Sequence, residues 1–180
     1  MFEMTNNKVM LRGRLQNDFV FFEEREGKKL YKGTIVVKSL KRRYEDKIDV
    51  LIEEKLLLKK ENDKKVEIRG KLDLNRGRCD ILVRNLHYLK EEDEPDLNFV
   101  FLEAYLIRKP CKRKKNTILS VALNQKSSAS YINCICTGLM VDRVNGFQVC
   151  EKKIKINGKI VTKRSNKRNI KVVLVDQIER

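Results

Sequence analysis

An internal repeat constrains the fold of this chain more than any other feature of its sequence. Lys64–Leu72 reads KKVEIRGKL and Lys152–Ile160 reads KKIKINGKI, with the same residue types in the same order. In both copies aliphatic residues alternate with polar ones, which is the period of a β-strand with one buried face. Each copy has a glycine on the aliphatic face, Gly70 or Gly158, where a missing side chain lets another backbone cross closely. We therefore predict two copies of a small, strongly curved barrel.

Strand signals in the rest of the chain agree with two barrels of five strands. They cover residues 7–15, 31–40, 47–52, 64–72 and 81–89 in the first copy, and 98–106, 118–123, 131–136, 154–160 and 170–178 in the second. Short helices are expected at Glu53–Lys60, where acids come first and lysines last, and at residues 138–146. Five strands with a helix between the third and fourth are the order of the OB-fold, an all-β Greek-key barrel that binds oligonucleotides over its second and third strands.

The acidic segment EEDEPD at residues 91–96 divides the chain. We predict an N-terminal OB-fold in residues 1–90, a linker in residues 91–96 and a C-terminal OB-fold in residues 97–180. The formal net charge of the 180 residues is +16, and so high a charge most often serves a polyanionic partner. Residues 97–180 hold 18 Lys and Arg against 5 Asp and Glu, whereas residues 1–90 hold 23 against 15. The second copy is therefore the better candidate for binding nucleic acid.

The sequence disfavours several other classes of protein. No apolar run approaches the roughly 18 residues of a membrane span, and Met1–Met10 lacks the apolar core of a signal peptide, so we expect a cytoplasmic protein without membrane contact. The five cysteines include no CxxC pair. Cys134 and Cys136 lie two apart in a strand, which favours buried free thiols over a zinc site. No P-loop, nucleophile elbow or metal-spaced His/Cys set is present, so we expect no cofactor, no metal and no enzymatic activity.

Several segments resemble the bacterial single-stranded DNA-binding proteins. The run YINCICTG, Tyr131–Gly138, is similar to the third strand of that family, and ILSVALNQ, Ile118–Gln125, is similar to the strand before it. The run KIKINGKIVTKR, Lys153–Arg164, resembles the family's strand with valine, glycine, arginine and isoleucine, and RKP, Arg108–Pro110, stands at its proline turn. NNKVMLRGRL, Asn6–Leu15, resembles the start of a two-domain subgroup found in firmicute bacteria and their mobile elements. The resemblance covers nearly the whole chain and implies two OB-folds that bind single-stranded DNA in replication, recombination or repair.

The chain departs from this family at the positions where bases stack. Thr137 stands where the family has a tryptophan, the matching region of the first copy, residues 52–54, has no aromatic residue, and the chain contains no tryptophan at all. Stacking on an aromatic ring stabilises by about 1–3 kcal/mol per base, so we expect weaker and more salt-sensitive binding. Because the sequence stops at Arg180 soon after its last strand signal, we also expect the protein to lack the acidic tail by which the family recruits replication partners.

The expected nucleic-acid site consists of basic loops and a few aromatic rings. In the second copy we expect contacts from two basic loops, the central hairpin, the Gly158 strand and a ring near another stacking position of the family: Arg108, Lys109, Lys112, Arg113, Lys114, Lys115, Lys126, Tyr131, Phe147, Lys155, Lys159, Lys163, Arg164, Lys167 and Arg168. The equivalent places of the first copy hold Lys38, Lys41, Arg42, Arg43, Tyr44, Arg69, Lys71, Arg76 and Arg78. Lysine-rich loops can also be merely solvated. Tyr31 and Tyr44 could stack on bases in the first copy, and core packing is the rival explanation for Tyr31. Phe19–Phe22 is assigned to the core or to an interface between the copies.

The sequence therefore predicts a tandem OB-fold protein that binds single-stranded DNA without strong sequence preference, mainly through its second copy. Two alternatives stay open. One is RNA as the main ligand, and the other is a protein-interaction adaptor of a replication or mobile-element complex with weak or no DNA binding. The resemblance also allows a homodimer with four OB-folds, and contacts with replication proteins in spite of the absent tail.

Overall fold

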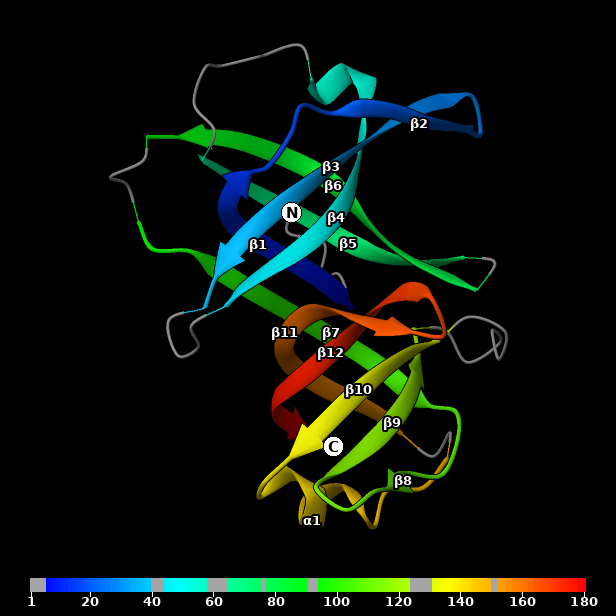
Figure 1. Cartoon of the computed structure of the whole chain (residues 1–180). Coiled ribbons are helices and arrows are strands. Elements are labelled where there is room, and N and C mark those ends of the chain that lie inside the picture. The colour runs from blue at the N-terminus through cyan, green and yellow to red at the C-terminus, as the bar shows by residue number, and fades with distance from the viewer. Residues whose placement is uncertain are drawn as a thin grey trace. The chain divides into compact units, whose positions relative to one another are not determined.

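The computed structural model describes residues 6–39, 44–57, 65–75, 77–90, 94–123, 131–149 and 152–180. These residues form two compact units, one with residues 9–73 and 80–98 and the other with residues 6–8, 74–79 and 99–180. Each unit is built around one five-stranded barrel (Figure 1). No helix in the described ranges is long and apolar enough to cross a membrane.

The first barrel closes in the strand order β1-β3-β4-β6-β5-β1. Strand β3 pairs antiparallel with both β1 and β4, and the β4–β6 pair is parallel. Strand β2 is added beside β3, and a short 3₁₀ turn follows β4. The elements are β1 (Asn7–Leu15), β2 (Val20–Arg25), β3 (Lys28–Lys38), β4 (Glu45–Glu53), the 3₁₀ turn (Glu54–Leu56), β5 (Lys65–Asn75) and β6 (Arg78–Leu89).

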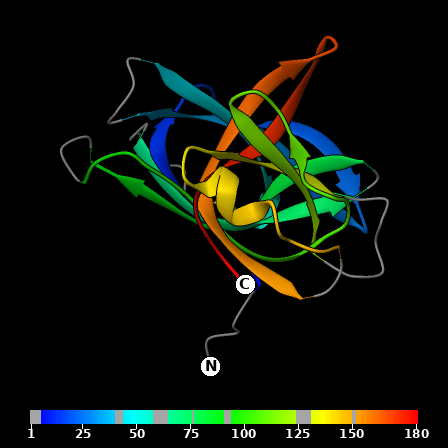
Figure 2. The ribbon, with the colours of Figure 1, turned by 90° about the horizontal axis from the view of Figure 1, so that it is seen from below.

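The second barrel repeats this order as β7-β9-β10-β12-β11-β7. The β10–β12 pair is again the parallel one, and a two-residue strand, β8, is added beside β9. Helix α1 lies across one end of this barrel (Figure 2). The elements are β7 (Leu97–Leu106), β8 (Cys111–Lys112), β9 (Asn116–Ala122), β10 (Ile132–Thr137), α1 (Met140–Val144), β11 (Lys153–Ser165) and β12 (Arg168–Glu179). Both barrels thus have the OB-fold strand order, which confirms the predicted fold class.

Glycine is required where two strands of a barrel cross closely. A Cβ atom at Gly158 would lie 2.2 Å from the carbonyl oxygen of Leu174, and one at Gly70 would lie 2.3 Å from that of Leu82. Gly13 has the same role in β1 of the first barrel. The register of β11 against β12 also shifts at Gly158, as expected for a bulge in a strongly bent strand. The predicted close approach at the repeat glycines is confirmed.

Aliphatic side chains fill the two interiors, and two thiols share the second one. Cys134 and Cys136 are fully buried on β10, as predicted from their spacing. Burial raises the pKa of Cys136 to about 11 and also raises the pKa of Cys134. Within the described ranges, no cluster of three or more His, Cys, Asp and Glu side chains could hold a metal ion. The largest fully buried side chains of the barrels include Leu11, Ile35, Ile48, Ile52, Ile68, Ile81, Leu102, Leu106, Leu119 and Ile156.

Two predicted elements differ from the structure. The helix expected over Glu53–Lys60 is reduced to the 3₁₀ turn, and residues 58–60 lie outside the described residues. The basic stretch Lys163–Arg168 is the tip of a hairpin rather than a loop, because β11 and β12 continue up to a two-residue turn. That turn, Asn166 and Lys167, has positive φ angles of 45° and 64°, which match the right-handed twist of the flanking strands.

The acidic segment between the copies is attached to the first barrel where it is described. The guanidinium group of Arg12 forms an ion pair with the carboxylate of Glu94. The ammonium group of Lys65 lies 3.6 Å from a carboxylate oxygen of Asp96. These residues of the predicted linker therefore pack with the unit that precedes them, and the predicted domain boundaries at residues 90 and 97 stay predictions.

Candidate nucleic-acid interface

Strands β9 and β10 form the face of the second barrel that corresponds to the second and third strands of an OB-fold. Their sequences, NTILSVA and INCICT, contain no charged residue. On this face the hydroxyl of Ser120 donates a hydrogen bond of 3.0 Å to the side-chain oxygen of Asn133, and Thr137 is exposed at the end of β10. The centre of the candidate interface is therefore neutral, and its charge comes from the segments around it.

The first of these segments, the β7–β9 connection, is a basic arm folded back on the barrel. Strand β8 within it pairs with the start of β9, and the backbone N–H of Arg113 donates a hydrogen bond of 2.8 Å to the carbonyl oxygen of Asn116. The arm is thus held against the second strand of the barrel. All its predicted cations are exposed: Arg108, Lys109, Lys112, Arg113, Lys114 and Lys115.

The structure brings two predicted residues, Arg108 and Tyr131, into contact. The guanidinium carbon of Arg108 lies 4.8 Å from the centroid of the Tyr131 ring, a cation–π distance. Tyr131 precedes β10 and is 36% exposed, so part of its ring stays accessible. This pair combines a cation with an aromatic surface, the two groups that bind phosphates and bases.

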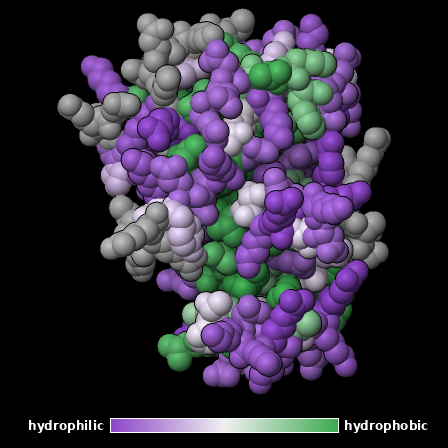
Figure 3. Space-filling model, in the orientation of Figure 1, coloured by the Kyte–Doolittle hydropathy of each residue, from purple (hydrophilic) through white to green (hydrophobic). Residues whose placement is uncertain are grey.

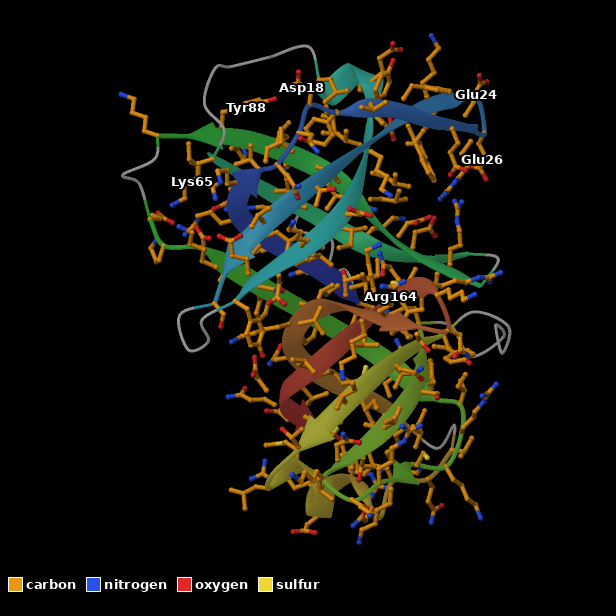
Figure 4. All side chains as sticks on the ribbon, in the orientation of Figure 1. Asp18, Glu24, Glu26, Lys65, Tyr88 and Arg164 are labelled. Carbon is orange, nitrogen blue, oxygen red and sulfur yellow. The ribbon has the colours of Figure 1, made fainter. Side chains whose placement is uncertain are left out.

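The β11–β12 hairpin is the second basic segment. Its ladder continues to Ser165 opposite Arg168, so the tip is held by paired strands. Figure 4 labels Arg164 near this tip. The four predicted cations of the hairpin are all exposed: Lys163, Arg164, Lys167 and Arg168. In OB-folds the connections between strands one and two and between strands four and five flank the ligand face. Both of these connections are basic in the second barrel.

The cations of the basic arm and the hairpin have no carboxylate partner in the part of the chain that the structure describes. None of them forms an ion pair within the described residues, whereas the ion pairs found there all join residues between 12 and 96. Uncompensated positive charge raises the local concentration of polyanions and speeds their association. The second barrel therefore carries exposed positive charge that no described carboxylate neutralises.

A cleft of about 620 Å³ adjoins the basic arm of the second barrel. Lys109 and Pro110 line one part of it, and residues 145–149, which include Phe147, line the rest. The guanidinium carbon of Arg180 lies 5.1 Å from the centroid of the Phe147 ring. Two predicted residues, Lys109 and Phe147, thus share one cleft.

Four predicted residues lie away from the candidate face of their barrel, which is β9–β10 in the second barrel and β3–β4 in the first. Lys155 and Lys159 are on β11, which is bordered by β7 and β12 and does not pair with β9 or β10. Arg69 and Lys71 are on β5, which occupies the same place in the first barrel. Arg69 also forms an ion pair of 3.1 Å with Glu67. The repeat that reveals the fold therefore belongs to the strand opposite the ligand face.

On the corresponding face of the first barrel, over β3 and β4, much of the positive charge is ion-paired. Four lysines on or beside it lie 2.8–3.9 Å from carboxylate oxygens, in the pairs Lys28–Glu53, Lys29–Glu54, Lys32–Asp49 and Lys55–Glu53. Hydrogen bonds from Lys55 and then Lys28 lower the pKa of Glu53, against the opposing effect of burial. Polyanion binding here would have to compete with these carboxylates.

The remaining predicted residues are peripheral or undescribed. Lys38, Tyr44 and Arg78 are exposed on the first barrel, and Tyr44 is 54% exposed. The other predicted residues lie outside the described residues: Lys41, Arg42, Arg43, Arg76 and Lys126.

Sequence reasoning missed an aromatic surface on β2. Phe19 is half-buried, and its ring lies against Gly33, where an added Cβ would be 2.4 Å from it. The core assignment is wrong for Phe21 and Phe22, which are 54% and 42% exposed. The Phe21 ring packs edge-on against the Tyr31 ring, with the two ring centroids 5.8 Å apart. Alternation of apolar and polar residues, the usual signal of a strand, is absent from this segment, so it was not recognised as one.

The two barrels define a tandem OB-fold protein, and solved structures contain the same architecture. The wild-type single-stranded DNA-binding protein from Thermus aquaticus is similar with a TM-score of 0.79 and 14% identity, over 97% of this chain and 92% of that chain. A deletion mutant of the Thermus aquaticus protein has a TM-score of 0.76 at 14% identity, over 97% of this chain and 93% of that one. No protein-family model and no curated protein matches the sequence. At this identity the similarity establishes the shared fold.

Proposed function

We propose that this chain binds single-stranded DNA without strong sequence preference, mainly through its second barrel. The observation that carries the proposal is the set of exposed cations on the basic arm and the hairpin, on both sides of the neutral β9–β10 face, none of which is ion-paired with another described residue. Strands two and three and these connections are where OB-folds bind oligonucleotides. The name of the Thermus aquaticus protein with the same fold supports single-stranded DNA as the ligand.

Binding would rest mostly on charge. Lysine and arginine side chains neutralise phosphate groups and release their counterions, so the logarithm of the binding constant falls with log salt by about 0.7 per phosphate contacted. Stacking is limited to a few rings, with Tyr131 and Phe147 as the candidates in the second barrel. The proposal therefore combines weak base contacts with a steep salt dependence. Neither phosphate contacts nor stacking on a ring distinguishes one base from another, which fits a protein that binds without sequence preference.

A titration of fluorescent oligo-dT at several salt concentrations tests the proposal. We expect binding that weakens linearly on the log-log scale, with a slope of about −2 to −4 for three to six contacts. A protein-interaction adaptor would retain oligo-dT only feebly and without dependence on oligonucleotide length. Competition by oligo-U of equal length distinguishes DNA from RNA as the preferred ligand.

The proposal extends to domain organisation and assembly. Residues 1–90 and 97–180 would be separate OB-folds, and the ion pairs of Glu94 and Asp96 suggest that a cut after Asp96 leaves the first one intact. Oligo-dT binding by each half then shows which barrel carries the activity. We propose a cytoplasmic protein that handles single-stranded DNA in replication, recombination or repair, and sedimentation would show whether two chains pair to give four barrels.

A further inference from the structure

Strand β2 is an exposed apolar edge of the first barrel. Among the described strands it pairs only with β3, and none of them forms a ladder with its other edge. Val20, Phe21 and Phe22 are 66%, 54% and 42% exposed. Figure 3 shows a green patch at the place of β2 in Figure 1, on a face that is mostly hydrophilic. Exposed apolar edge strands are either interaction sites or aggregation hazards.

Acidic residues stand at both ends of this apolar stretch. Asp18 precedes it, and Glu24 and Glu26 follow it, with the three side chains placed around β2 in Figure 4. Two cations lie beside this stretch, and carboxylates pair with both. The guanidinium group of Arg25 lies 2.5 Å from Glu23 and 2.6 Å from Asp73. The ammonium group of Lys32, 5.8 Å from the centroid of the Phe22 ring, lies 2.8 Å from Asp49. The edge therefore presents an apolar centre between negative ends.

We infer that the free edge of β2 docks an extended segment of a partner protein, with an apolar centre flanked by lysine or arginine on both sides. Such a segment would add a strand to the barrel, with main-chain hydrogen bonds for affinity and side-chain pairing for specificity. Its apolar residues would cover Val20, Phe21 and Phe22, and its cations would lie opposite the acids at the two ends. This inference goes beyond DNA binding and does not depend on it.

The charge pattern selects against two other occupants. In an antiparallel pair of β2 with a second copy of itself, overlap of the apolar residues centres on Phe21 and places Asp18 opposite Glu24, and like charges opposite each other are destabilising. The register shift between Phe21 and Glu23 further disturbs a regular self-pair. A polynucleotide would meet Asp18, Glu24 and Glu26 with its own negative charge.

Binding of synthetic peptides to the full chain tests the inference. Three fluorescent peptides of about ten residues, within the usual length of a strand, share one apolar centre and carry lysine, serine or glutamate on both flanks. We expect the lysine-flanked peptide to bind at least about fivefold more tightly than the serine-flanked one, and the glutamate-flanked peptide to bind least. The substitution Glu24→Lys should reduce the difference in affinity between the lysine-flanked and glutamate-flanked peptides, or reverse their order.

Variants of the strand itself complete the test. Val20→Ser with Phe22→Ser should abolish the preference for the lysine-flanked peptide, whereas Ile170→Ser, at a 39% exposed apolar residue of β12, should not. Equal binding of all three peptides, or binding that survives the double substitution, would overturn the inference. The inference would also be overturned if the double substitution abolished self-association of the protein, or if it lowered the affinity for oligo-dT. Oligo-dT affinity that stays unchanged while peptide binding is lost separates this site from the proposed DNA site.

Discussion

Replacing Gly158 by alanine should destabilise the second barrel strongly. The added Cβ would lie 2.2 Å from the carbonyl oxygen of Leu174, whereas ordinary contacts of a Cβ begin near 3.4 Å. The obstacle is backbone, so β11 and β12 would have to separate at the point where they pair. Overpacking typically costs about 1–3 kcal/mol, and we expect the upper half of that range. For a barrel of this size the melting temperature should fall by roughly 10–20 °C.

Thermal unfolding followed by circular dichroism measures this effect, with Gly146→Ala as the matched control. A Cβ at Gly146 meets nothing within 4 Å. Alanine there should leave stability unchanged or raise it by about 0.4–1 kcal/mol, because it restricts the unfolded chain. If Gly158→Ala melted within about 2 °C of the parent protein, well under the shift expected for 1 kcal/mol, the close crossing of the two strands would be wrong.

Three further predictions concern single side chains. Hydrogen bonds, of which that from Arg12 is the strongest, lower the pKa of Glu67. The ionised Glu67 carboxylate therefore stabilises the fold fully above its unfolded pKa of about 4.3, and this stabilisation is lost as the pH falls through the lower folded pKa. Urea unfolding of Glu67→Gln should therefore show less acid sensitivity, and an unchanged pH profile would refute the ion pair. The exposed Cys111 should be alkylated well before the buried Cys136, whose pKa is about 11, and mass spectrometry showing equal rates would contradict the burial. Tyr131→Leu should weaken oligo-dT binding at least about fivefold while Tyr131→Phe retains it, and equal losses would argue against stacking.

The fold could be predicted because its signals are local and repeated. The alternation around Gly70 and Gly158 specifies a buried strand face, and the glycines specify a close crossing. Strand order then follows from the number of strands and the place of the helix. The basic arm and hairpin could be identified for a similar reason, since a cluster of lysines and arginines is visible in any conformation.

What the sequence could not show is which charges compensate each other. The first barrel has many cations, but the Lys32–Asp49 and Lys28–Glu53 pairs join residues on different strands, so their mutual neutralisation appears only after folding. For the same reason Lys155 and Lys159 looked equivalent to the hairpin cations, although β11 lies away from the ligand face. Strand β2 was missed because exposure on both faces removes the alternation that marks a strand.

The central claim is that free charge on the second barrel, not total charge, binds single-stranded DNA. Two variants with equal loss of charge test it in an oligo-dT titration. One replaces the hairpin cations with serine: Lys163, Arg164, Lys167 and Arg168. The other replaces the ion-paired lysines of the first barrel with serine: Lys28, Lys29, Lys32 and Lys55.

In the hairpin variant, the slope of the log binding constant against log salt should become less negative by about 0.7 for each phosphate contact removed. Near 0.1 M salt this corresponds to a loss of about fivefold in affinity per contact. The first-barrel variant should keep the slope of the parent protein. Equal losses in both variants, or a greater loss in the first-barrel variant, would contradict the claim.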